Sequence, residues 1–112
     1  MTNPQKTKGD KAEREIAALL DALIGGNVRR KLGAGRADDT GDLHGIPNTV
    51  AEVKSYANVA TGIRSAMAGL DVKRRNAGVD HAVAFIRRPG GEWLAVTTVE
   101  QWATYHREAV GA

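Results

Sequence analysis

Three charged residues in the stretch from Gly33 to Tyr56 could together form a metal-dependent site. Asp42 comes shortly before a strand-like segment, and Glu52 and Lys54 stand two residues apart within that segment. Because side chains alternate across a strand, Glu52 and Lys54 share one face. Carboxylate oxygens bind hard cations such as Mg²⁺, which can activate a water and neutralise charge growing on a phosphodiester. A lysine beside the ion could orient that water or stabilise the same charge. The pattern is compatible with phosphodiester hydrolysis.

A fourth acidic residue, Glu13, lies in a segment with helical periodicity, predicted over residues 10–24. Glu13 falls in the middle of the apolar stripe of this helix, which consists of Ile16, Ala17, Leu20 and Ile24. Taken singly, each residue has a simpler interpretation. Glu13 could pair with a neighbouring basic side chain, and Glu52 and Lys54 could form an exposed ion pair worth only about 0.2–1 kcal/mol. All four residues together favour a site.

The remaining elements place these residues in an α/β fold, a mixed sheet flanked by helices. The predicted order is helix, three strands, helix, two strands, helix, in one domain over residues 10–112 that follows a flexible N-terminus at residues 1–9. The further elements are strands at 27–32, 42–46, 49–56, 81–86 and 93–98 and helices at 60–76 and 98–109. The strands at 42–46 and 49–56 are predicted to form a hairpin. Gly78 ends the second helix, Thr98 and Gln101 open the last one as a capping box, and Trp93 and Trp102 are assigned to the core.

Composition narrows the class of protein. The chain has 112 residues, 42% of them hydrophobic and 26% charged, which suits one globular domain. It has no cysteine, which excludes disulfides and thiolate zinc sites. Its apolar runs are too short for a membrane span, so we expect a cytoplasmic protein with no membrane partner. The net charge of +3 suits a polyanion such as DNA, although each basic cluster taken alone could equally be a solvated patch.

The spacing of Asp42, Glu52 and Lys54 resembles the Asp…Glu-x-Lys core of the PD-(D/E)xK nuclease superfamily. The segment KGDKAERE, residues 8–15, resembles the first helix of archaeal-type Holliday junction resolvases. The loop GAGRADDTGD, residues 33–42, is similar to the basic glycine-rich loop of small resolvase-like nucleases from actinobacterial phages. The motifs cover about residues 8–56, and the order of elements extends the likeness more loosely over the whole chain.

The resemblance implies a restriction-endonuclease-like core with Glu13, Asp42, Glu52 and Lys54 as catalytic residues. By the same analogy, Asp42, Glu52 and the backbone carbonyl of Val53 would bind Mg²⁺ or Mn²⁺, with Glu13 binding directly or through a water. The implied activity is cleavage of four-way DNA junctions by a homodimer. The residues expected to contact DNA are Arg29, Arg30, Lys31, Arg36, Thr40, Arg64, Lys73, Arg74 and Arg75.

Several departures and alternatives accompany this resemblance. Gly41 stands where the superfamily has proline, Thr40 is the one hydroxyl residue of the loop, and Lys73 or Arg74 would replace a glutamine of the second helix. Asp38 and Asp39 could be a second metal shell or simply favour the loop, and His44 could approach the site or be a structural histidine. The alternative functions are a general nuclease for restriction or end processing, and a non-catalytic DNA-binding module. The acidic residues of such a module would be ion-paired.

Overall fold

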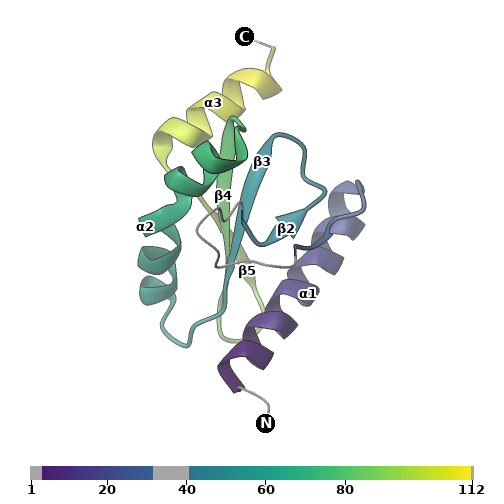
Figure 1. Ribbon diagram of the computed structural model, residues 1–112, viewed down its shortest axis with the longest axis vertical. Coiled ribbons are helices and arrows are strands. Elements are labelled where there is room, and N and C mark those ends of the chain that lie inside the picture. The colour runs from purple at the N-terminus through teal and green to yellow at the C-terminus, as the bar shows by residue number, and fades with distance from the viewer. Residues whose placement is uncertain (1–3, 32–40, 112) are drawn as a thin grey trace.

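The computed structural model describes residues 4–31 and 41–111, with side chains from Gly9 onward, and confirms the predicted α/β order (Figure 1). Its elements are α1 (Pro4–Ile24), β1 (Arg29–Arg30), β2 (Leu43–His44), β3 (Thr49–Lys54), α2 (Val59–Ala77), β4 (His81–Arg87), β5 (Trp93–Val96) and α3 (Val99–Ala109). Within the described ranges, no helix is both long enough and apolar enough to cross a membrane.

A three-stranded mixed sheet in the order β3-β4-β5 forms the centre of the fold. Strands β3 and β4 are parallel, with Glu52 opposite Ala84, and α2 makes the crossover between them. Strand β5 returns antiparallel to β4. Strand β3 is therefore at an edge of this sheet. Asp42 lies beside its free edge.

The predicted hairpin between residues 42–46 and 49–56 is wrong in its pairing. Strand β2 pairs antiparallel with β1, so that Arg29 lies opposite His44. Gly45 explains this pairing, because at φ +98° its backbone lies against Asn27 and Val28 so closely that an added Cβ would sit 2.8 Å from the Asn27 carbonyl oxygen. Beside β3, the same segment keeps a backbone hydrogen bond of 2.8 Å from Asp42 N–H to the Ala51 carbonyl.

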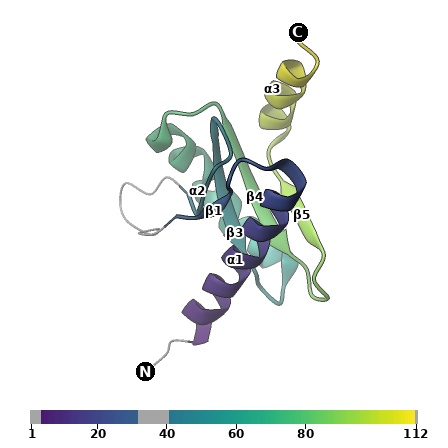
Figure 2. The same cartoon turned by 90° about the vertical axis from the view of Figure 1, so that its right-hand side faces the viewer.

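The helices cover the two faces of the sheet unequally. Figures 1 and 2 show α2 on one face and α1 on the other, with α3 near the end of the sheet where β4 begins. Side chains alternate accordingly: Val50 and Ile86 pack in the clusters on the α2 side, whereas Val53 and Phe85 pack against α1. Glu52 therefore points toward α2 and Glu13 comes from the opposite side.

The helix ends follow local signals in the sequence. Asn58 caps α2 by accepting a 3.1 Å hydrogen bond from Thr61 N–H, and Gly78 ends that helix in the left-handed conformation at φ +67°, as predicted. Thr98 caps α3 through Gln101 N–H at 3.1 Å. The Gln101 side chain, however, accepts a hydrogen bond from Ala82 N–H at 3.0 Å, which ties α3 to β4.

Two predictions about the outer parts of the chain need correction. The first helix begins at Pro4, six residues before the predicted start, because proline at the first helical position tolerates its missing N–H. The segment predicted to be flexible, residues 1–9, is thus helical from Pro4. Trp102, which the sequence predicts in the core, is 58% exposed, whereas Trp93 is partly buried against the α1 cluster.

Candidate active site

Asp42 lies along the open edge of β3 and is fixed there by the backbone. Its carboxylate accepts a 2.8 Å hydrogen bond from Val53 N–H, and its side chain is buried. The preceding Gly41 has φ +102°, and a Cβ there would lie 3.1 Å from the Ala51 carbonyl oxygen. Proline, with φ near −65°, cannot adopt this conformation, which explains why glycine precedes Asp42 in this chain.

Val53 presents its backbone to the same edge. Its N–H points to Asp42 rather than to β4. Since the N–H and C=O of one strand residue point to the same side, the Val53 carbonyl also faces this edge. The structure therefore places the Asp42 carboxylate and the Val53 carbonyl on the same edge of β3, and metal binding by that carbonyl stays a prediction.

Glu52 approaches Asp42 from the α2 side of the sheet. It is 1% exposed, and its Oε1 forms an ion pair with Lys73 Nζ of α2. The pKa of Glu52 is raised to about 7: burial is the largest cause, the charge of Asp42 and a hydrogen bond with that carboxyl group add to it, and Lys73 opposes the rise. The carboxyl groups of Glu52 and Asp42, which repel each other when both are ionised, thus lie together in a buried place. A bound cation would offset this repulsion.

Glu13 reaches the site from α1. Arg30 Nε donates a 3.1 Å hydrogen bond to Glu13 Oε1, and Arg30 Nη2 donates to Asp10 Oδ1 at 2.7 Å. Burial raises the pKa of Glu13, the hydrogen bond from Arg30 lowers it, and the charge of Asp42 raises it. The charge of Asp42 therefore affects the pKa of Glu13, whose carboxylate is held in place by the hydrogen bond from Arg30.

An open cavity of about 520 Å³ joins most of these groups. It is lined by Gly9, Glu13, Asp42, Val53, Lys54, Ser55, Tyr56 and Ala57. Three of the four predicted catalytic residues therefore line one cavity, and Glu52 contacts Asp42 from outside it. Lys54 is half-buried at the cavity and makes no ion pair with a described residue.

The donor set fits a hard divalent cation with few protein ligands. Among residues 4–31 and 41–111, no group of three or more His, Cys, Asp or Glu side chains is arranged to hold a metal ion. Mg²⁺, however, commonly uses one or two carboxylates, waters and substrate phosphate. Asp42, Glu52 and the Val53 carbonyl would supply that smaller set, with Glu13 next to it.

The predicted DNA contacts fall into two groups. Arg30 and Lys73 are paired with acidic residues of the site, and Arg74 is bound to Asp71 and to the Val79 carbonyl. Arg29, Arg64 and Arg75 are exposed, Arg75 being paired with Asp71, and Lys31 is half-buried. Arg36 and Thr40 lie outside the described residues, as do Asp38 and Asp39.

His44 does not line the site cavity. It is exposed on β2 and lines a separate cavity with Lys31, and partial desolvation and the charges of Lys31 and Arg29 lower its pKa. The structure thus gives His44 a basic neighbourhood and separates it from Glu13 and Lys54.

Tyr56 and Ser55 belong to the site cavity although their residue types gave no reason to choose them. Tyr56 is 39% exposed, and its hydroxyl lies 3.4 Å from Ser65 Oγ of α2. The signal that could have found them is their position directly after Lys54, at the end of β3.

Comparison of the chain with protein-family models, with curated proteins and with solved structures finds no match.

Proposed function

We propose that the chain is a metal-dependent DNA endonuclease that hydrolyses phosphodiesters in branched DNA, most specifically in four-way junctions. The observation that carries the proposal is the edge of β3, where the Asp42 carboxylate and the Val53 carbonyl lie together, with Glu52 behind them and Lys54 beside them. The restriction to junctions rests on the resemblance of residues 8–56 to resolvases. The same centre could serve a general nuclease.

Different residues of the chain would have different roles in the hydrolysis. Asp42, Glu52 and the Val53 carbonyl would hold Mg²⁺, or Mn²⁺ in its place. The bound ion would supply an activated water and a positive charge next to the scissile phosphate. Lys54 would stabilise the negative charge that develops on that phosphate, since it is a basic residue that lines the open cavity. Glu13 would orient groups on the α1 side of the same cavity.

The exposed basic side chains support binding to DNA. Arg29 on β1 and Arg64 on α2 are exposed, and the net charge of the chain is +3. Resolution of a junction needs two symmetric cuts, so the active form would be a homodimer. The cytoplasm is the compartment proposed for this activity.

The second candidate function is a non-catalytic DNA-binding module. One observation favours it: the acidic residues of the site are ion-paired, Glu13 with Arg30 and Glu52 with Lys73. A module that keeps the fold for its shape would need these pairs to hold its buried carboxylates. Such a protein would bind junctions but would neither bind Mg²⁺ nor cut DNA.

The test is incubation with a labelled four-way junction and a matched linear duplex, each with Mg²⁺ and with chelator. We expect paired symmetric nicks in the junction with Mg²⁺ and none with chelator. Asp42→Asn should lower the cleavage rate at least about 10³-fold, equivalent to about 4 kcal/mol of transition-state stabilisation, while junction binding persists. The matched control is Asp80→Asn, because Asp80 is exposed at the start of β4 and hydrogen-bonded to Asn48.

Each outcome separates the candidates. If Asp42→Asn cleaves the junction at an unchanged rate, Asp42 is not part of the active site. Cleavage of both substrates at equal rates would replace the resolvase by a general nuclease. Tight junction binding with no cleavage in Mg²⁺ or Mn²⁺ would establish the non-catalytic module instead.

A further inference from the structure

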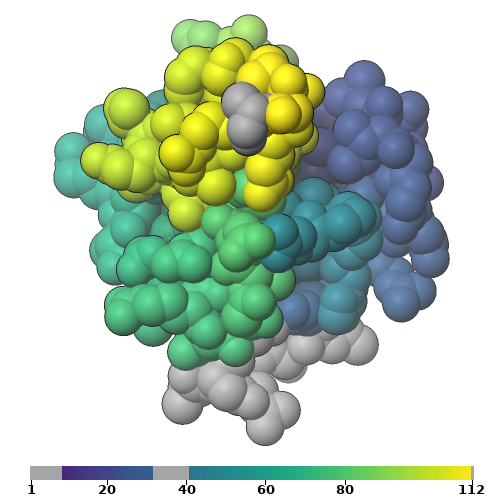
Figure 3. Space-filling model, turned by 90° about the horizontal axis from the view of Figure 1, so that it is seen from above, coloured from purple at the N-terminus to yellow at the C-terminus, as the bar shows by residue number. Residues whose placement is uncertain are grey.

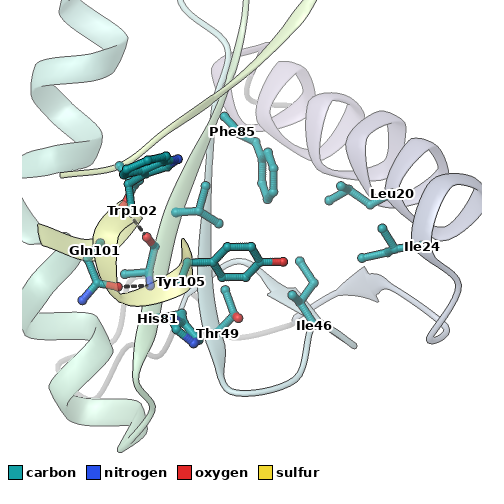
Figure 4. A pocket seen from close by; sticks show the side chains of 13 residues that line it. Leu20, Ile24, Ile46, Thr49, His81, Phe85, Gln101, Trp102 and Tyr105 are labelled. Carbon is teal, nitrogen blue, oxygen red and sulfur yellow. Dashed lines mark hydrogen bonds between the residues drawn. The ribbon is translucent and has the colours of Figure 1, made fainter. Parts of the chain in front are cut away.

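An apolar groove of about 310 Å³ lies far from the site cavity, between α1 and α3 on the α1 side of the sheet. Figure 4 shows Leu20 and Ile24 of α1 on one side of it, Trp102 and Tyr105 of α3 on the other, and Phe85 of β4 between them. The view in Figure 3 likewise separates α3 from the end of α1, with residues near the start of β3 between them. The groove and the site cavity share no lining residue.

Helix α3 is attached to the sheet by polar contacts, and none of its side chains is buried. Gln101 accepts a hydrogen bond from Ala82 N–H at 3.0 Å, and His81 Nε2 lies 2.6 Å from Glu108 Oε2. An amphipathic helix normally packs its apolar stripe against the core. Here Trp102 and Tyr105 are 58% and 61% exposed, so the described part of the chain does not cover the apolar side of α3.

The exposed apolar area is large enough for a protein interface. Of the nine large hydrophobic residues that the described part of the chain exposes, seven belong to the second half of α1 or to α3 and its C-cap: Leu19, Leu23, Ile24, Val99, Trp102, Tyr105 and Val110. At their exposed fractions these side chains present on the order of 600–800 Å². That summed area approaches the ~800 Å² that each partner contributes to a standard interface, and three of the seven residues, Ile24, Trp102 and Tyr105, line the groove itself.

We propose that a second copy of this chain covers the groove, with α3 of each copy lying in the groove of the other. A two-fold interface requires one surface that is complementary to itself. This surface provides both parts, because Trp102 and Tyr105 of the exposed helix α3 line the same groove as Leu20 and Ile24 of α1 (Figure 4). Ile24, Trp102 and Tyr105, the exposed apolar residues that line the groove, are then buried in the same contact.

This arrangement leaves both site cavities open. The groove is lined by Thr49 at the start of β3, whereas Lys54 at the end of β3 lines the site cavity. Five residues of extended strand separate them by about 17 Å. The inference does not depend on nuclease activity, and it deepens the proposed function only by identifying the surface that would join two sites.

The first experiment measures the mass of the full chain by sedimentation equilibrium over a range of concentrations. We expect a species of twice 11.9 kDa for the unmodified protein. Trp102→Glu should raise the dimer dissociation constant at least tenfold, and so should Ile24→Glu on the opposite wall. Both positions are more than half exposed, so the variants should fold, which circular dichroism checks. Val72→Glu, an exposed apolar position on α2, is the matched control and should leave the dimer intact.

The second experiment uses the absence of cysteine from the chain. A mixture of Ile24→Cys and a size-tagged Trp102→Cys should form a mixed disulfide under mild oxidation, because the proposed contact brings α3 of one copy to α1 of the other. A monomer at every concentration, a dimer unaffected by both glutamate variants, or cross-links between two Trp102→Cys chains without the mixed product would overturn the proposal. Asp42→Asn should dimerise normally, so the outcome is independent of cleavage.

Discussion

The two faces of the central sheet contrast in how they treat apolar and charged side chains. On the α2 face, Val50, Ala84 and Ile86 are almost fully buried, and the carboxylate of Glu52 is enclosed among them. On the face shared by α1 and α3, packing is complete only near α1, and Trp102 and Tyr105 remain exposed. One face buries a charge, and the other exposes hydrophobic surface.

Both features lower the stability of the fold, for different physical reasons. A buried carboxylate requires a partner to offset its desolvation, and Glu52 has Lys73 on one side and a second acid, Asp42, on the other. Exposed apolar side chains lose the favourable free energy of burial. The α2 face therefore holds the buried acidic group of the proposed site, while the α1–α3 face carries the surface proposed for association.

The packing contrast can be tested by truncating one aliphatic side chain to alanine on each face. Ile86 is fully buried against α2, and Ile86→Ala should lower the free energy of unfolding by about 2–4 kcal/mol through lost burial and the cavity left behind. Val99 is 78% exposed on α3, and Val99→Ala should change it by less than about 0.5 kcal/mol at low protein concentration. Urea unfolding measures both. Similar losses at the two positions would mean that α3 packs more tightly than its exposure indicates.

The sequence predicts features that depend on neighbouring residues better than features that depend on distant ones. The apolar period of residues 10–24, Gly78 and the Thr98 cap act over a few residues, and the structure confirms all three. The placement of Glu52 and Lys54 on one face of β3 likewise follows from alternation alone.

Features that depend on chain segments far apart were not predictable. The pairing of β2 with β1 depends on the close approach of Gly45 to Asn27, and the exposure of Trp102 depends on how far α3 lies from α1. The ion pair of Lys73 with Glu52 joins α2 to β3 across the core. A single sequence shows that Lys73 is basic and on a helix, but not which acid it meets.

A smaller change in the free energy of unfolding is expected from the ionisation of the buried Glu52. The pKa of Glu52 in the folded protein, about 7, is above its ordinary value of 4.5, so the folded state holds this proton more tightly than the unfolded state. The resulting stability is fully present below about pH 4.5 and is lost as the pH rises through about 7. Between pH 5 and pH 8, in chelator, the unmodified protein should lose about 1–3 kcal/mol more than Glu52→Gln.

The measurement is urea unfolding of both proteins at several pH values, with the difference between them plotted against pH. Glu92→Gln is the matched control, because Glu92 is exposed at the β4–β5 turn, where it pairs with Arg88. Parallel pH profiles for the unmodified protein and Glu52→Gln would show that Lys73 keeps Glu52 ionised throughout this range.

The smallest effect distinguishes two adjacent arginines of β1, one exposed and one paired inward. Arg29 makes no ion pair with a described residue, whereas Arg30 binds Asp10 and Glu13. If Arg29 contacts a phosphate, Arg29→Ala should weaken junction binding and make the slope of log affinity against log salt shallower by about one unit. Arg30→Ala should leave that slope unchanged and instead lower the stability of the α1–β1 contact. Salt titrations of junction binding compare the two variants directly, and a shallower slope for Arg30→Ala would mean that Arg30 leaves its acidic partners to meet DNA.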